Sequence, residues 1–261
     1  MCIEKYTEAD LIGFLSEMGL DGSETLMVHS SMKSIGQVEG GADTVLDALF
    51  KYFSKGLLVF PAFSYATVAF PFNMRFDKDK SPSCTGILTE LFRQRPGVVC
   101  RSLHPQHSVT AAGRDADEFV AGHYKCHSGF SKNGPFGRLL ERKGKILLIG
   151  VGLNRVSLIH AIIEWSGAPV CAKEPQVFSL VDSDGKIYEA KNHYHLGSQW
   201  EFFPRALPLL EAGNAVKKVK FGDAQSLLLD VEKTVEILDA VLKKDYHFFY
   251  NPDCPAAIQM P

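Results

Sequence analysis

The chain has 261 residues, of which 46% are hydrophobic and 11% aromatic, so it is long enough to bury one large core. Its 28 Lys and Arg residues nearly balance its 30 Asp and Glu residues, and no long run of one charge sign occurs. This balance argues against nucleic acid and acidic membrane surfaces as partners. No apolar run approaches the roughly 20 residues that are needed to span a bilayer.

The six cysteines are scattered through the chain and form no CxxC pair, and the start MCIEKYTEADL does not have the pattern of a signal peptide. We therefore expect reduced thiols in a cytoplasmic protein. The residues concerned are Cys2, Cys84, Cys100, Cys126, Cys171 and Cys254.

Helical and strand patterns alternate through the first two thirds of the chain. Residues 5–20 have helical periodicity, TLMVHS over 25–30 reads as a strand, a helix starts near Ala42, and LLVFPAF is a second apolar strand. A strand, a helix and another strand form a βαβ unit. The alternation then continues with a helix over 86–93, the strand VVCR near Val98, the helix PFGRLLER, a strand over 146–152 and a helix over 156–165.

From about Pro175 the pattern changes. VFSLVDSDGKIYEAKNHYH predicts a β-hairpin, because Ser183, Asp184 and Gly185 supply turn residues between two strand-like runs. A helical stretch EFFPRALPLLEAG, a short strand within KKVKFGDAQSLLLD and the amphipathic helix VEKTVEILDAVLKK follow. We predict an α/β fold in which a layered, mixed β-sheet is flanked by helices and followed by a β-rich C-terminal portion. Residues 1–261 are expected to form a single domain.

The segment GVGLNRVSLIHAIIEWSG places His160 four residues before Glu164 in the predicted helix. Residues at i and i+4 share one helix face, so the carboxylate could orient the imidazole while one ring nitrogen stays free to take a proton. A core histidine beside a surface glutamate is the alternative interpretation.

A second informative segment, HSSMKSIGQVEGGADTVLDAL, lies between a strand and a helix. Hydroxyls of Ser30, Ser31 and Ser34, the charge of Lys33 and the start of the next helix favour an anion such as a pyrophosphate. The segment is neither a Walker loop nor a GxGxxG fingerprint. An ordinary strand-to-helix loop explains the same residues.

Histidines elsewhere in the chain raise a third class of function. His104 and His107 follow a strand, and His193 and His195 alternate along a predicted strand, where they line a pocket or face solvent. Together they suggest a metal-dependent hydrolase, but no acidic or cysteine partner has useful spacing, so we expect no metal site. Ser108 opens the strand-like run SVTAA and could face a ligand.

Five motifs in this order resemble one family, the aminoglycoside 3-N-acetyltransferases. They are LMVHSSMKSIGQVEGGADTVLDAL, GLLVFPAFSY, SPSCTGILTELFRQRPGVVCRSLHPQHSVTAAG, NGPFGRLLERKGKILLIGVG and SLIHAIIEWSGAP. The resemblance covers about residues 5–170. It implies a single acyltransferase domain with a non-GNAT α/β fold, acetyl-CoA as co-substrate and a small-molecule amino sugar as acceptor. A homo-oligomer is left open.

The resemblance also implies roles for individual residues. His160 matches the catalytic histidine of the family, and Glu164 matches its acidic partner less closely, because many members carry the carboxylate three residues after the histidine, where this chain has Ile163. The expected contacts to coenzyme A are His29, Ser30, Ser31, Met32, Lys33, Ser34, Gly36, Gly41, Ser64 and Ser108.

This chemistry suits a histidine base. An amine that is protonated near neutral pH must lose a proton before it attacks a thioester, and an imidazole with a pKa of about 6.5 can take that proton. Backbone N–H groups would stabilise the oxyanion. We expect direct attack in a ternary complex, since no cysteine has a matching base in a readable motif.

The charge of the chain bears on the acceptor. Polycationic aminoglycosides call for an acidic cleft, whereas this chain is nearly neutral and its segment 70–80 is aromatic with mixed charges. We therefore favour a smaller amino sugar, linked to a nucleotide, because aromatic walls and cationic groups suit a base and a diphosphate. The alternatives to an acyltransferase are a non-catalytic coenzyme A-binding protein and the metal-dependent hydrolase.

Overall fold

The computed structural model describes residues 5–95, 99–196 and 199–250. The α-helices are α1 (Glu8–Glu17), α2 (Ala42–Tyr52), α3 (Ile87–Arg93), α4 (Ala116–Val120), α5 (Pro135–Glu141), α6 (Ser157–Trp165), α7 (Leu207–Ala212) and α8 (Val231–Lys244). The strands are β1 (Thr25–Ser30), β2 (Leu57–Pro61), β3 (Arg75–Asp77), β4 (Cys100–Arg101), β5 (Val109–Gly113), β6 (Lys145–Ile149), β7 (Gln176–Val181), β8 (Ile187–Asn192), β9 (Val216–Phe221) and β10 (Ala224–Asp230). Short 3-10 helices are η1 (Met32–Ile35), η2 (His123–Lys125), η3 (Leu153–Arg155) and η4 (Gln199–Ala206).

Within these ranges, seven strands form one mixed sheet in the order β4-β5-β2-β1-β6-β10-β9. The three central strands, β2, β1 and β6, are parallel, and antiparallel strands extend the sheet on both sides. The central strands are apolar at almost every position, as expected for strands that are buried on both faces. The predicted mixed α/β sheet is therefore confirmed.

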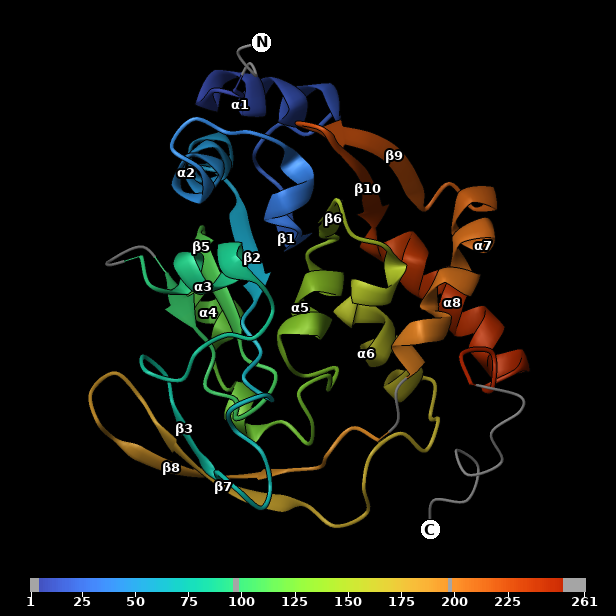
Figure 1. Ribbon diagram of the computed structural model, residues 1–261. Coiled ribbons are helices and arrows are strands. Elements are labelled where there is room, and N and C mark those ends of the chain that lie inside the picture. Colours follow the sequence, from blue (N-terminus) through green and yellow to red (C-terminus); the bar gives the residue numbers. More distant parts are fainter. Residues whose placement is uncertain (1–4, 96–98, 197–198, 251–261) are drawn as a thin grey trace.

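Helices cover both faces of this sheet (Figure 1). Side chains alternate along a strand, so Leu26 and Val28 of β1 pack with α1, α2 and α3, whereas Met27 packs on the opposite face with α4, α5, α6 and α8. The first helix begins with a capping box, in which the Thr7 hydroxyl accepts from the amide of Asp10 and the Asp10 carboxylate accepts from the amide of Thr7. Alternation and capping together fix which side of the sheet each helix covers.

A small second sheet lies beside the main one. Its order is β3-β7-β8, and the strands β7 and β8 form the predicted hairpin, with Gly185 at a positive φ of 79° in the turn. The extra strand β3 comes from residues far earlier in the chain and runs parallel to β7. Side chains of this sheet, among them Phe76 and Phe178, form a separate small apolar cluster.

The C-terminal part of the chain differs from the prediction in one respect. The expected short strand within KKVKFGDAQSLLLD is a hairpin of two strands, β9 and β10, which complete one side of the main sheet. The turn at Gly222 has a positive φ of 59°, and three Lys residues among the six positions of β9 interrupt the apolar pattern typical of a strand. In the predicted strand VVCR, Val98 lies outside the described residues, and Cys100 and Arg101 form β4. No helix in the described part of the chain is long and apolar enough to cross a membrane.

Truncation at the centre of the sheet tests this packing. Leu148 of β6 is fully buried, so Leu148→Ala is expected to lower the free energy of unfolding by about 2–5 kcal/mol. Urea unfolding followed by circular dichroism measures the change. Leu209→Ala is the matched control, because Leu209 is 36% exposed and its truncation should cost much less. Equal losses in the two variants would contradict the layered arrangement.

Candidate active site

The carboxyl ends of β1 and β6 open into a cavity. These strands are parallel neighbours, and Ser30, the last residue of β1, is in register with Ile149, the last residue of β6. The loops that follow both strands line a cavity of about 910 Å³, together with residues from α3, α6 and the segment after β8. Ligands commonly bind at the carboxyl ends of parallel strands, so this cavity is the candidate site.

Five of the ten expected coenzyme A contacts lie at the end of β1 and in the loop after it. His29, Ser30, Ser31, Met32 and Lys33 all line the cavity. His29 is 9% exposed, and its Nε2 has no hydrogen-bond partner among the described residues. Burial lowers the pKa of His29 to about 3, so its ring is neutral near pH 7. A buried, unpaired nitrogen at the cavity wall is available to a bound ligand.

Ser34 joins the loops after β1 and β6 by hydrogen bonds and does not line the cavity. Its Oγ donates to Oγ of Ser31 at 2.9 Å and lies 3.3 Å from the carbonyl oxygen of Gly150. Gly150 has a φ of 62°, and a Cβ there would lie 2.2 Å from the Cβ of Ser34. The close approach of the loops therefore requires glycine at this position.

The predicted coenzyme A contacts Gly36 and Gly41 lie away from the cavity lining. Neither residue lines the cavity. Gly36 abuts the β9–β10 turn, where a Cβ would lie 2.2 Å from Oδ2 of Asp223, and Gly41 is the N-cap residue of α2. Both glycines shape the loop and do not form the site surface.

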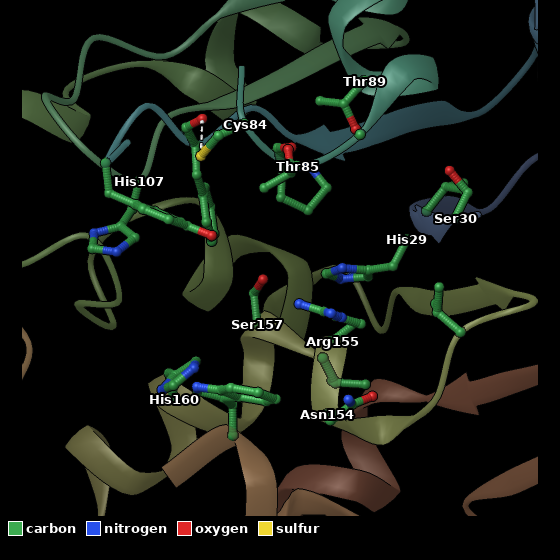
Figure 2. A pocket seen from close by; sticks show the side chains of 18 of the residues that line it. His29, Ser30, Cys84, Thr85, Thr89, His107, Asn154, Arg155, Ser157 and His160 are labelled. Atoms are coloured by element: carbon green, nitrogen blue, oxygen red, sulfur yellow. Dashed lines mark hydrogen bonds between the residues drawn. The ribbon is translucent and has the colours of Figure 1, made fainter. Parts of the chain in front are cut away.

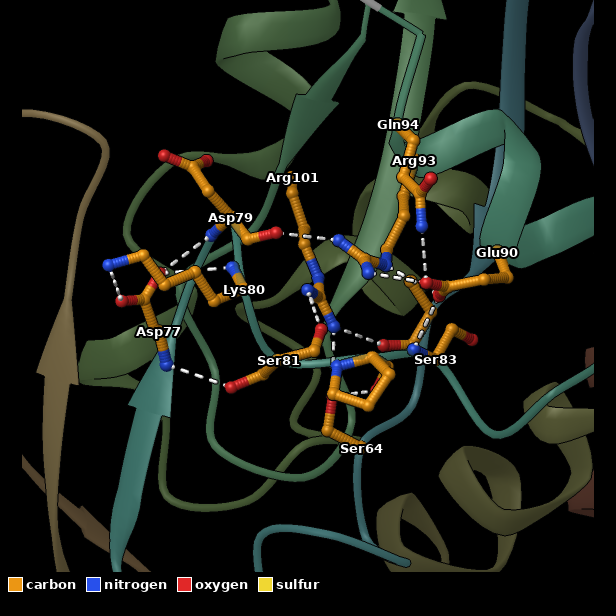
Figure 3. A network of polar contacts seen from close by, with 12 residues as sticks. Ser64, Asp77, Asp79, Lys80, Ser81, Ser83, Glu90, Arg93, Gln94 and Arg101 are labelled. Carbon is orange, nitrogen blue, oxygen red and sulfur yellow. Dashed lines mark hydrogen bonds and ion pairs between the residues drawn. The ribbon is translucent and has the colours of Figure 1, made fainter.

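Ser64 and Ser108, which were also predicted to contact coenzyme A, do not line the cavity. Both are fully buried and bind the guanidinium group of Arg101: Nη2 donates to Ser64 Oγ at 2.8 Å and Nε donates to Ser108 Oγ at 3.0 Å. Arg101 also donates to the carbonyl groups of Ala62, Lys78 and Ser81 (Figure 3). This network fixes the segment 78–81, which precedes the cavity residues Cys84 and Thr85. The two serines therefore stabilise the cavity wall without lining it.

His160 lies on α6 and lines the cavity (Figure 2). Its ring stacks on Phe130 at a centroid distance of 5.2 Å and meets the rings of Phe203 and His195 edge-on at 4.8 and 5.1 Å. This apolar packing and, to a lesser degree, the neighbouring histidines His195 and His107 hold the pKa of His160 well below 6.5. The imidazole is therefore neutral near pH 7 and can accept a proton.

Glu164 forms no hydrogen bond with His160 in this structure, so its predicted orienting role stays a prediction. Its Oε2 accepts from Ser128 Oγ at 2.5 Å and from Cys171 Sγ at 3.5 Å, while Nδ1 of His160 is buried without a hydrogen-bond partner among the described residues. Glu164 and His160 lie on one face of α6, but this spacing alone does not determine which group hydrogen-bonds to the carboxylate. The loop that carries Ser128 offers a donor, and Trp165 also binds this loop through Phe130.

His195 is a cavity residue, although the alternation pattern favoured a solvated strand face. Strand β8 ends at Asn192, so the alternation does not reach His195, whose ring lies 5.1 Å from those of Phe130 and His160. Burial lowers the pKa of His195 to about 4. The sequence contained no signal for this contact, because it joins segments 35 residues apart.

The histidines of the hydrolase alternative do not form a ligand set. His104 Nε2 lies 3.1 Å from Oδ1 of Asn192, and its Nδ1 accepts from the amide of His107. His193 Nδ1 lies 2.8 Å from the carbonyl oxygen of Ala172. Among the residues with described positions, no group of three or more His, Cys, Asp or Glu side chains could hold a metal ion.

Several cavity residues were missed at the sequence level. Arg155 and Ser157 lie within the motif GVGLNRVSLIH, in which only the histidine had a predicted role. The aromatic wall was expected from segment 70–80, but no residue of that segment lines the cavity; Tyr65, Tyr194 and Trp200 do so instead. Two loops and η4, which meet only in the folded chain, supply these three rings, so no local spacing in the sequence predicts them.

Comparison with known proteins identifies the family to which this architecture belongs. The family model for aminoglycoside 3-N-acetyltransferase matches residues 27–243, and the chain belongs to this family. It is accordingly an enzyme of the acyltransferase class that uses acetyl-CoA as its co-substrate.

Individual relatives extend the similarity over different lengths. An aminoglycoside N(3')-acetyltransferase-like protein of Bacillus subtilis, YokD, is 25% identical and aligns over 89% of this chain and 91% of its own. Aminoglycoside N(3)-acetyltransferase III of Salmonella sp is 31% identical over 171 residues, which are 59% of each chain. A solved mutant of the aminoglycoside acetyltransferase AAC(3)-IVa, in complex with a gentamicin, superimposes with a TM-score of 0.83, at 26% identity, over 98% of this chain and 95% of that chain.

The buried histidines predict acid sensitivity. Burial lowers the pKa of His29 and of His123 from 6.5 to about 3, whereas each titrates near 6.5 in the unfolded chain. Between these values the unfolded chain binds more protons, so stability is complete above about pH 6.5 and falls as the pH falls. Each such histidine contributes roughly 1.4 kcal/mol per pH unit. Urea unfolding at several pH values measures the slope, and His123→Asn should reduce it; a flat profile would contradict the assignment.

Replacing Glu164 tests the hydrogen-bonding pattern around α6. Because its carboxylate binds Ser128 and not His160, Glu164→Gln is expected to lower kcat for acetyl transfer by less than about tenfold. Thiol release from acetyl-CoA measures kcat. Ser128→Ala should have an effect of similar size, since it removes the other partner. A loss with Glu164→Gln as large as that with His160→Ala would mean that the carboxylate acts directly on the imidazole during turnover.

Proposed function

We propose that the chain, acting as one acyltransferase domain, transfers an acetyl group from acetyl-CoA to the amino group of a small amino sugar, with His160 as the general base. The observation that carries this proposal is a single cavity whose lining includes both His160 and the loop of Ser30 to Lys33. Donor and base are thereby brought to one space, although their residues lie more than 120 positions apart in the sequence.

The first loop suits the donor. Lys33 supplies a positive charge, Ser30 and Ser31 supply hydroxyl donors, and unpaired Nε2 of His29 supplies a further polar contact. Phosphate groups favour this combination of charge and hydrogen-bond donors. The fit of these residues to coenzyme A supports the proposed assignment of His29 to Lys33, whereas Ser34 acts through the loop geometry.

The reaction needs one proton acceptor in the cavity. Neutral His160 takes a proton from the acceptor amine as the amine nitrogen forms its bond to the thioester carbon. The carbon–sulfur bond then breaks, and the imidazolium returns the proton to the leaving thiolate, so that the products are the amide and the coenzyme A thiol. The lowered pKa of His160 favours this return, because a weakly basic imidazole releases its proton readily.

The walls of the cavity support a nucleotide-linked amino sugar as the acceptor. Tyr65 and Trp200, 47% and 37% exposed, line the cavity and offer ring faces on which a base can stack. The relative AAC(3)-IVa was solved with a gentamicin, an aminoglycoside, and is the contrasting case. The two acceptor classes differ in charge, so a panel of both separates them.

Removing the base tests the proposal. His160→Ala is expected to lower kcat by about 100- to 10,000-fold, because the amine proton loses its acceptor. Thiol release measures turnover, and calorimetry measures coenzyme A binding, which should change little. His247→Ala is the matched control, since His247 does not line the cavity. Full turnover by His160→Ala would refute the role of this histidine, and coenzyme A binding without turnover of any amine by the unmodified enzyme would favour a binding protein.

A further inference from the structure

Polar groups that the acetyl-transfer chemistry does not use gather at the start of α6. Asn154, Arg155 and Ser157 line the cavity, and Figure 2 shows them around the same space as His29 and His160. Ser157 precedes His160 by three residues, so both lie on one face of α6 about one helical turn, about 5 Å, apart. A group bound here is therefore close to the reacting amine.

The charge of Arg155 is not compensated by the protein. Its side chain is exposed and forms no ion pair with any residue whose position is described, and the guanidinium carbon lies 5.6 Å from the ring centroid of Trp200. Contact with an aromatic face orients a guanidinium group while leaving its N–H edge free for a planar anion. The side chain is thus held in the cavity with its donors available.

Ser157 supplies a second, independent indication of a ligand. It is only 7% exposed, and its hydroxyl has no hydrogen-bond partner among the described residues, yet Figure 2 shows it directed into the cavity. Ser157 is also the first residue of the nine-residue helix α6, whose N-cap residue, Val156, has no side-chain acceptor for the amides of the first turn. The amide of Ile159 donates to the carbonyl oxygen of Val156 at 3.1 Å. The amides of Ser157 and Leu158 and the positive end of the helix dipole therefore remain to favour an anion at this point.

The net charge of the cavity lining suits an anionic ligand. Its lining, as far as the structure describes it, contains no Asp or Glu and two permanent cations, Lys33 and Arg155. Burial keeps the pKa values of His29, His107 and His160 low, so these rings add no charge near pH 7. The described lining offers no carboxylate to bind a polycationic acceptor. It offers an anionic group the guanidinium of Arg155, the hydroxyl of Ser157 and the N-terminus of α6.

We infer that Arg155, Ser157 and the start of α6 bind a phosphate group carried by the acceptor, so that the preferred acceptor is an amine that also bears a phosphate ester or a nucleoside diphosphate. The inference rests on the proposed function and deepens it by naming the residues that select the acceptor. The amine then reaches His160 while the phosphate remains one helical turn away, a separation that one sugar ring can span.

The test compares amines of different charge with acetyl-CoA held at saturation. The acceptors are glucosamine, glucosamine 6-phosphate, UDP-glucosamine and gentamicin, and the enzymes are the unmodified chain, Arg155→Gln and Arg75→Gln. Arg75 is exposed on β3 and does not line the cavity, so its variant controls for the loss of one positive charge. Thermal melting confirms that each variant is folded.

The unmodified enzyme is expected to have a kcat/KM for a phosphate-bearing amine at least about tenfold above that for glucosamine and gentamicin. Arg155→Gln should lower the ratio of kcat/KM for the phosphate-bearing amine to that for glucosamine by about 10- to 100-fold, with the KM for acetyl-CoA nearly unchanged. Arg75→Gln should leave this ratio unchanged. A better rate with UDP-glucosamine than with glucosamine 6-phosphate identifies the diphosphate as the group that is bound, and the reverse order identifies the monoester.

Three results would overturn the inference. The first is a preference for gentamicin, the second is an unchanged preference in Arg155→Gln, and the third is a raised KM for acetyl-CoA in that variant without loss of acceptor preference, which would assign Arg155 to the donor. Thiol release with any of the amines separates these failures from failure of the proposed function. If no amine supports thiol release, the proposed function falls and this inference falls with it.

Discussion

The parallel pairing of β1 with β6 is the contact on which the site depends. Because Ser30 and Ile149 are in register, the two strands end at the same level, and the amide of Ser31 continues the pairing by donating to the carbonyl oxygen of Ile149 at 2.9 Å. The loop that suits coenzyme A and the loop that leads through η3 to α6 therefore begin side by side. A shift of one residue in this register would turn the side chains of β1 to the opposite faces and separate the loops.

Buried polar groups support the cavity at two levels. Arg101 binds backbone carbonyls and the hydroxyls of Ser64 and Ser108 behind one wall, where removal of its guanidinium group would leave several acceptors unsatisfied. Closer to the ligand space, apolar rings such as Phe130 surround His160 and keep it neutral. Burial keeps these histidines neutral in the folded chain, whereas they bind protons in the unfolded chain at low pH. Acid therefore favours the unfolded state.

The charge of the cavity lining is the basis of the proposed acceptor class. The described lining residues provide two cations and no carboxylate, so charge complementarity favours an acceptor with a negative group over a polycation. Arg155 ends η3, two residues before α6 begins at Ser157, and Ser157 lies about one turn before His160. In our proposal, the end of η3 and the first turns of α6 select the acceptor and remove its proton, while the end of β1 and the loop after it hold the donor.

The sequence alone determined the alternating elements, the apolar central strands, the loop from His29 to Lys33 and the position of His160 on a helix after a strand, because each depends on local periodicity or on ordered motifs. Tertiary structure decided the partners. Glu164 accepts a hydrogen bond from Ser128, and Ser64 and Ser108 accept hydrogen bonds from Arg101. Tyr194, His195 and Trp200 reach the cavity from the segment after β8 and from η4, far along the chain. Helical spacing places two side chains on one face, but a hydrogen bond forms with whichever donor the surrounding loops bring within reach, and that choice is made only when distant segments pack together.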